Sequence, residues 1–185
     1  MEVSQDFLVT TDRLSALLAP QVLKIRRALP QDVCVLYQAA REISKTPGVL
    51  LLLPHEFGEA EFRDKLQWIG KAGICLVAEC DGKLLGHAWL DPMPLSVVAH
   101  VFSLSLLVHP DQHGCGIAND LLTALTDWAA QAGRVEKIEW RIREQNHAAR
   151  QQAKCFGFIE EGRFARSLKL PNGSYLSDIA LAKFY

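Results

Sequence analysis

The segment from Val108 to Ala118 carries the residue types that point most directly to chemistry. Gly114 and Gly116 stand one residue apart, just before an amphipathic stretch that begins at Ile117. Glycines let a backbone turn tightly and approach a ligand with no side chain in the way. The first N–H groups of a helix, together with the helix dipole, favour an anion. The segment therefore predicts a pyrophosphate-binding turn, and the glycines alone leave a plain strand-to-helix turn as an open alternative.

Two other phosphate-binding motifs fit this segment poorly. A nucleotide P-loop has the pattern GxxxxGK[ST], and no Lys-Ser or Lys-Thr pair follows the glycines. A dinucleotide-binding fold would have a third glycine where Asn119 stands. Its turn would also follow the first strand of the domain, whereas four predicted strands precede this one. The sequence argues against both motifs.

The hydrophobic pattern predicts the elements that must position this turn. Helical spacing and cap signals predict helices from the Gln31-Asp32 cap to Ile43, from about Glu59 to Ile69, from Ile117 to a stop at Gly133, and over Asn146–Phe156. Alternation and turn residues predict strands at Leu23–Arg27, Ile74–Cys80, Lys83–Leu90, Val98–Val108, Lys137–Arg143, Phe158–Leu170 and Tyr175–Ala182. The strand–helix–strand segment from 98 to 143 must be a parallel, right-handed crossover. The order predicts an α+β (mixed α/β) fold.

Composition narrows the class of protein. The chain has 185 residues and a net charge of −1, from 20 basic and 21 acidic side chains. We expect one domain over residues 23–185, preceded by an N-terminal extension over residues 1–22. Without a basic excess or a long apolar stretch, we expect no nucleic-acid partner and no membrane span. Five scattered cysteines without a CxxC pair predict neither a disulfide frame nor a structural zinc site, and a reducing cytoplasm fits best.

Four motifs, in the right order, resemble the GNAT N-acetyltransferases. The central family motif is Arg/Gln-x-x-Gly-x-Gly/Ala, usually after a Val-x-Pro, and His113 stands where the family has Arg or Gln. The matching residues are Val108-His109-Pro110, Gly114, Gly116-Ile117-Ala118, then Asn146, Ala149 and Gly157-Phe158, the closing Asn172-Gly173-Ser174-Tyr175 with Asp178, and the early segment from Ile25 to Asp32. The resemblance covers about residues 23–183 and is to small bacterial members.

The resemblance implies a fold and a cofactor. The fold would have a GNAT-like central sheet, mixed but mostly antiparallel, with six to seven strands, about four helices and one parallel crossover. The strands at 98–108 and 137–143 would splay apart, and backbone groups in the gap would bind the pantetheine arm of acetyl-coenzyme A (acetyl-CoA) as an added strand would. No metal is implied. The residues expected to bind acetyl-CoA are Leu106, Leu107, Val108, His113, Gly114, Cys115, Gly116, Ile117, Ala118 and Asn146.

Catalysis would need a group that takes a proton from the acceptor amine, because an alkyl amine is mostly protonated at pH 7. The candidates for this base are Glu56, His100 and Ser103. The family often has a tyrosine that protonates the leaving thiolate, and Ala153 occupies that position. Tyr175 or a water could replace it, or the thiolate could leave unaided, since a thiol pKa of about 8.5 makes it a tolerable leaving group.

The implied function is an acetyl-CoA-dependent N-acetyltransferase that moves an acetyl group directly to a primary amine of a small molecule, amino acid or peptide. The alternative is a non-catalytic acetyl-CoA-binding sensor module, which the missing tyrosine favours. A nucleotide-binding protein unrelated to CoA is a third, weaker hypothesis. The expected partners are acetyl-CoA and an amine acceptor, with a homodimer as one option for assembly.

Overall fold

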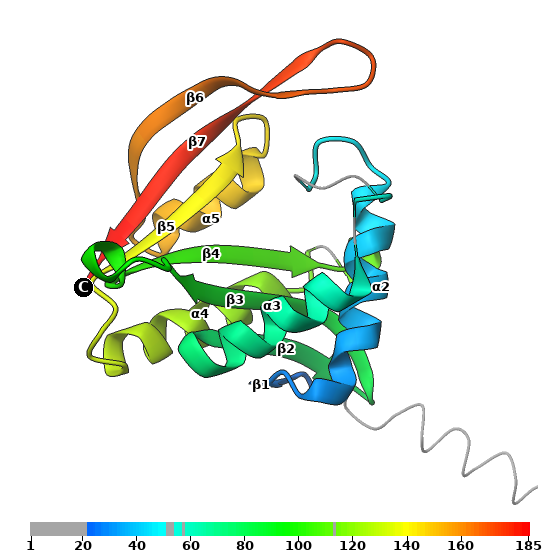
Figure 1. Cartoon of the computed structure of the whole chain (residues 1–185), viewed down its shortest axis with the longest axis vertical. Helices are drawn as coiled ribbons and strands as arrows, with labels where there is room; N and C mark the ends of the chain where they lie inside the picture. Colours follow the sequence, from blue (N-terminus) through cyan, green and yellow to red (C-terminus); the bar gives the residue numbers. More distant parts are fainter. Residues whose placement is uncertain (1–21, 51–53, 57, 113) are drawn as a thin grey trace, which may run out of the picture.

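Seven strands form one mixed sheet in the order β1-β2-β3-β4-β5-β7-β6 (Figure 1). The computed structural model describes residues 22–50, 54–56, 58–112 and 114–185. Within that part of the chain the sheet carries four α-helices, and one neighbouring pair of strands is parallel. The predicted fold class is confirmed. The predicted N-terminal extension, residues 1–22, lies outside the described residues except for Val22.

The first half of the sheet is an antiparallel meander. Its strands are β1 (Lys24–Arg27), β2 (Ile74–Cys80), β3 (Lys83–Pro92) and β4 (Val101–Val108). Asp81 and Gly82 join β2 to β3 with φ angles of 49° and 76°, the left-handed backbone that a tight hairpin turn requires. The strand predicted from Val98 begins only at Val101, because Ser96–Val98 forms a turn of 3₁₀-helix.

Helices cover both faces of this half. The helices α2 (Val33–Ser44) and α3 (Glu59–Ala72) lie on one face, and α4 (Ile117–Gln131) lies on the other (Figure 1). A small apolar cluster fixes α2 and α3 to the sheet and contains Val33, Leu36, Leu66, Ile69, Cys75 and Val77. Both faces are therefore apolar, as a sheet with helices on both sides requires. No helix in the described ranges is long and apolar enough to span a membrane.

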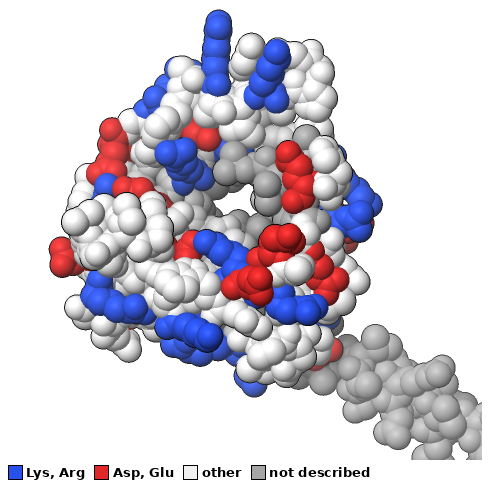
Figure 2. All heavy atoms as spheres, viewed as in Figure 1, with Lys and Arg blue, Asp and Glu red and all other residues white. Residues whose placement is uncertain are grey.

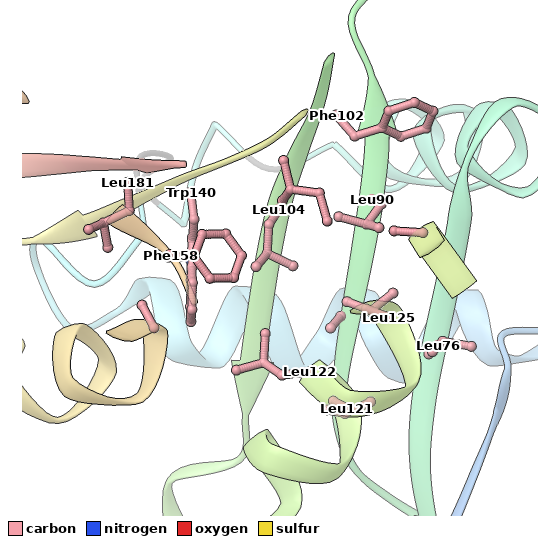
Figure 3. Close-up of a cluster of buried hydrophobic side chains, with 14 of the residues drawn as sticks. Leu76, Leu90, Phe102, Leu104, Leu121, Leu122, Leu125, Trp140, Phe158 and Leu181 are labelled. Atoms are coloured by element: carbon pink, nitrogen blue, oxygen red, sulfur yellow. The ribbon is translucent and has the colours of Figure 1, made fainter. Parts of the chain in front are cut away.

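The main core lies between the sheet and α4. Figure 3 shows Leu121, Leu122 and Leu125 of α4 pointing toward strand residues such as Leu90 and Leu104. A neighbouring part of the same core packs Trp140 edge-on against Phe158, with ring centroids 5.7 Å apart. Burying several such side chains stabilises the fold by about 1.5–3 kcal/mol each. This core holds α4, and hence the glycine turn before it, firmly against β3 and β4.

The second half of the sheet leaves the first half at an angle. It contains β5 (Lys137–Arg143), α5 (His147–Cys155), β6 (Ile159–Lys169) and β7 (Tyr175–Phe184). The parallel strands β4 and β5 pair only from Val101 to Ser103, opposite Lys137 to Glu139. Beyond Ser103 the two strands diverge (Figure 1). The sheet is therefore continuous at one end and split at the other.

Candidate active site

A large pocket lined by described residues runs through the split in the sheet. Its volume is about 2030 Å³, and its lining includes residues from β4, β5, the start of α4, α5 and the α2–α3 region. Figure 2 shows an opening at the centre of the face that carries α2 and α3, with acidic side chains gathered beside it over α3. Because lining residues come from both faces of the sheet, two molecules can meet in the gap from opposite sides.

The backbone of β4 turns polar groups into the gap. Peptide groups alternate in direction along a strand. The carbonyl oxygen of Val101 and the N–H of His109 both bond toward the β3 side, at 3.0 and 2.8 Å. The N–H and C=O groups of even-numbered residues therefore point toward β5. At Leu106, however, β5 no longer lies beside β4. The N–H and C=O of Leu106 face the gap, whereas the backbone of Leu107 faces β3.

The glycine turn forms the mouth of the pocket on the α4 side. Gly114 and Gly116 have φ angles of 85° and 80°, and a Cβ on either would meet nothing within 4 Å. Gly116 is the N-cap of α4, and no side chain among the described residues caps this helix end. The N–H groups of Ile117 and Ala118 have no partner within the helix because they lie in its first turn. Left-handed backbone, space and free donors together fit a pyrophosphate.

Helix α5 forms the wall opposite α4. Its N-cap, Asn146, accepts a hydrogen bond from the N–H of Ala149 at 3.1 Å. Gln152 donates to the side chain of Asn119 at 2.8 Å and so links α5 to the first turn of α4. Asn146, Ala149 and Gln152 all line the pocket. The Oδ1 of Asn146 accepts the capping hydrogen bond, and its amide nitrogen donates to no described residue.

Two substitutions of Asn146 separate the cap from a contact with the cofactor. Asn146→Ala should lower the free energy of unfolding by about 1 kcal/mol, because the cap is lost. Asn146→Asp keeps a cap acceptor but loses the amide donor, so it should keep stability and raise the KM for acetyl-CoA by about 10-fold. Urea denaturation and steady-state kinetics measure the two effects. An unchanged KM in both variants would leave Asn146 with the cap role alone.

The other side of the gap has polar side chains from β4 and β5. Ser103 is the register partner of Asp91 in β3, and Asp91 bonds to Lys65 and Trp68 of α3. Ser103 therefore faces α3 rather than α4. On β5 the residues Ile138, Trp140 and Ile142 join the main core. Alternation then places Glu139, Arg141 and Arg143 on the same face as Ser103.

Arg143 fixes the loop after α2 over this face. Its Nε donates to the carbonyl oxygen of Gly48 at 2.7 Å, and its Nη1 pairs with the buried carboxylate of Asp178 in β7. Trp89 and Phe62, with ring centroids 6.4 Å apart, line the pocket nearby. This part of the pocket therefore offers apolar surface beside charged groups.

The predicted site residues divide according to their place in the structure. Those that line the pocket are Glu56, Ser103, Leu106, Leu107, Val108, Gly114, Gly116, Ile117, Ala118 and Asn146. Cys115 is exposed in the turn but does not line the pocket, and His113 lies outside the described residues. His100 precedes β4 at its paired end, about 25 Å along the strand from the glycine turn.

Neither Tyr175 nor Ala153 contributes a side chain to the pocket. Tyr175 is half-exposed near the tip of the β6–β7 hairpin, where the guanidinium of Arg166 lies 5.4 Å from its ring. Ala153 is fully buried in the main core. Cys155, one turn of the helix away from Gln152, does line the pocket. The position of the usual tyrosine therefore faces the protein interior here.

Sequence reasoning missed Glu139 and Arg141 as site residues. The alternation of Lys137–Arg143 placed them on one face, but that face looked like the solvent side of a strand. Only the pairing of β5 with β4 at Ser103 shows that it lines the pocket. Lys137 donates hydrogen bonds to Glu139, at 2.8 Å, and to Glu161, and these two bonds raise the pKa of Lys137.

Comparisons with known proteins find the same architecture. The sequence model of the acetyltransferase (GNAT) family matches residues 37–158. The L-amino acid N-acetyltransferase AaaT of Escherichia coli (strain K12) is 27% identical over 163 residues, which are 86% of this chain and 96% of that protein. An acetyltransferase of the GNAT family from Streptococcus pneumoniae has a TM-score of 0.82 at 21% identity, over 89% of this chain and 100% of that one.

A further solved structure contains the cofactor. The yncA protein of Salmonella typhimurium, solved with its cofactor acetyl-CoA, has a TM-score of 0.80 at 19% identity, over 88% of this chain and 94% of that one. The family match spans β4, the glycine turn and α5, which are the walls of the pocket described above. The chain belongs to the acetyltransferase (GNAT) family and is an acyltransferase.

Proposed function

We propose that this enzyme transfers the acetyl group of acetyl-CoA directly to a primary amine. The observation that carries the proposal is the pocket that passes through the sheet between β4 and β5. One mouth has the glycine turn and the start of α4, which suit a pyrophosphate. The other mouth has the charged face of β5, where an acceptor can approach. Donor and acceptor therefore meet without a covalent enzyme intermediate.

A free amino acid is the acceptor that we favour. The relative AaaT is named for L-amino acids and covers most of this chain. The acceptor half of the pocket combines apolar side chains such as Phe62 and Trp89 with acidic and basic groups. Such a mixture suits a small zwitterion with an apolar side chain better than a uniformly charged ligand.

The backbone of Leu106 would carry the electrostatic part of catalysis. Bound acetyl-CoA supplies an activated acetyl thioester. The N–H of Leu106 faces the gap and would donate to the thioester carbonyl oxygen, where negative charge grows during attack. A preorganised donor of this kind contributes about 3–4 kcal/mol in other acyl transfers. Since the donor is a peptide group, no side chain in the sequence identifies it.

The leaving group would depart without a side-chain acid. Ala153 is buried, and Tyr175 lies outside the pocket lining, so neither supplies a proton to the thiolate. With no side-chain acid to lose its proton, the rate should level off rather than fall between about pH 8.5 and 10. Tyr175→Phe should leave this profile unchanged.

Turnover with a panel of amines at several pH values tests both the acetyl transfer and the departure of the thiolate without a side-chain acid. Free CoA thiol and N-acetylated product are measured together. A protein that binds acetyl-CoA but acetylates none of the amines would be the binding module instead. A bell-shaped profile that Tyr175→Phe converts to a plateau, with a loss of about 100-fold in turnover, would assign the acid to Tyr175.

A further inference from the structure

A carboxylate from β5 lies at the apex of the split, the point where β4 and β5 stop pairing. Glu139 is the register partner of Ser103, the last residue of β4 that pairs with β5. Neighbouring strands lie about 4.8 Å apart, so the two side chains stand next to each other on the α3 face. Leu106 follows three residues later, about 10 Å along β4. Glu139 therefore stands where the acceptor amine must pass to reach the thioester.

The bonding of Glu139 leaves it free to accept another donor. Its Oε1 accepts from the Nζ of Lys137 at 2.8 Å, and no described residue bonds to its other oxygen. Lys137 also pairs with Glu161 at 2.8 Å. Two carboxylates thus share one ammonium group, and the cluster keeps an excess negative charge. An ammonium ligand in the pocket would meet an unsatisfied acceptor there.

The neighbouring carboxylate of β3 is already occupied. The Oδ1 of Asp91 accepts from the indole N–H of Trp68 at 3.1 Å, and its Oδ2 pairs with Lys65. Ser103, between Asp91 and Glu139, is a hydroxyl and a weak base. Of the three groups at the apex, Glu139 alone has a carboxylate oxygen without a bond to a described residue.

Arg141 is the next residue of β5 on the same face. Its guanidinium lies 4.1 Å from the centre of the Phe164 ring, and no carboxylate among the described residues pairs with it. Stacking on a ring leaves the edge of a guanidinium free to bind a carboxylate with two hydrogen bonds. Residues two apart on a strand are about 6.7 Å apart, a spacing that a ligand with adjacent ammonium and carboxylate groups can bridge.

We propose that Glu139 and Arg141 form the acceptor site: Glu139 binds the ammonium group and takes its proton, and Arg141 binds the carboxylate of a free amino acid. This rests on the proposed acetyl transfer. The ammonium proton passes to Glu139 and then to solvent. The neutral nitrogen forms a bond to the thioester carbonyl carbon, and the carbon–sulfur bond breaks with its electrons on sulfur. The surplus proton of the nitrogen goes to the thiolate, so an N-acetyl amino acid and free CoA thiol result.

Glu139→Gln tests the proton acceptor. Its kcat at pH 7 should fall about 100-fold, and the deficit should shrink toward pH 10, where the amine is already neutral. Glu160→Gln is the matched control, because Glu160 is an exposed carboxylate of β6 that pairs with Arg150 and does not line the pocket. It should keep its kcat. Equal kcat in wild type and Glu139→Gln, or a loss confined to Glu56→Gln, would overturn the assignment. Circular dichroism and melting temperatures confirm that each variant is folded.

Arg141→Gln tests the carboxylate site with L-phenylalanine and L-phenylalaninamide. The wild type should prefer the acid by at least about 10-fold in kcat/KM, since a charge-assisted pair is worth about 1.5–3 kcal/mol. Arg141→Gln should raise the KM for L-phenylalanine, so that the kcat/KM values for the acid and the amide become nearly equal. Arg134→Gln, another arginine stacked on aromatic rings but away from the pocket, should keep the preference. A wild type that acetylates both compounds equally would overturn the carboxylate site and leave acetyl transfer intact.

Discussion

Replacing Gly116 with valine is expected to weaken acetyl-CoA binding by about 100-fold or more, since at least two hydrogen bonds to a charged group would be lost. Gly116 has a φ angle of 80° and lies directly before the free N–H groups of Ile117 and Ala118. A side chain there fills the space that the pyrophosphate would occupy. It also disfavours the left-handed backbone that aims those donors at the pocket.

Gly133→Val is the matched control for this substitution. Gly133 has a φ angle of 63° near the C-terminal end of α4, and a Cβ there also meets nothing within 4 Å. Both valines should cost about 1–3 kcal/mol of stability through backbone strain. Titration calorimetry should find lost binding only for Gly116→Val. If both folded variants bind acetyl-CoA like the wild type, the turn has no role beyond joining β4 to α4.

The wild type is expected to lose about 2 kcal/mol of stability between pH 7.5 and pH 5 because of His87 alone. Burial lowers the pKa of His87 from 6.5 to about 4, and its Nε2 lies buried with no hydrogen-bond partner among the described residues. His87 stays neutral in the folded state, while the unfolded chain binds a proton below pH 6.5. The contribution of neutral His87 to the free energy of unfolding is fully present above pH 6.5 and is lost as the pH falls toward 4.

His87→Leu should remove this loss. Leucine suits the site, where the imidazole stacks on Trp89 with ring centroids 5.2 Å apart and pairs in register with Val77 and Leu107. Urea denaturation at pH 7.5 and 5 should show a smaller pH dependence for His87→Leu than for the wild type. The exposed His147→Leu should behave like the wild type. An equal decline in His87→Leu would show that other groups cause the acid sensitivity.

Local signals in the sequence predicted most of the elements. Asp81-Gly82 predicted the hairpin, and the alternation over Lys137–Arg143 predicted β5 with the bounds found in the structure. The start of β4 was less well predicted, because Val98 is apolar enough for a strand but belongs to a 3₁₀ turn. Propensity cannot distinguish the two when tertiary contacts decide.

The acceptor side of the site could not be predicted in the same way. Its geometry depends on where β5 leaves β4, and no residue pattern marks the last paired position at Ser103. The resemblance to the family predicted Leu106 as a cofactor contact, but its peptide group faces the gap only because β5 no longer lies beside β4 at that position. Charged residues on a strand normally indicate a solvent face, so Glu139 and Arg141 gave no separate signal.

A crystal structure with acetyl-CoA would show where the donor lies relative to β4 and to the acceptor side of the gap. We expect the pyrophosphate against the N–H groups after Gly116, the pantetheine arm in the gap beside β4, and the thioester oxygen within hydrogen-bond distance of the Leu106 N–H. The acetyl group should then face Glu139. Acetyl-CoA bound outside the gap, or with its acetyl group turned away from the α3 face, would contradict acetyl transfer through the gap.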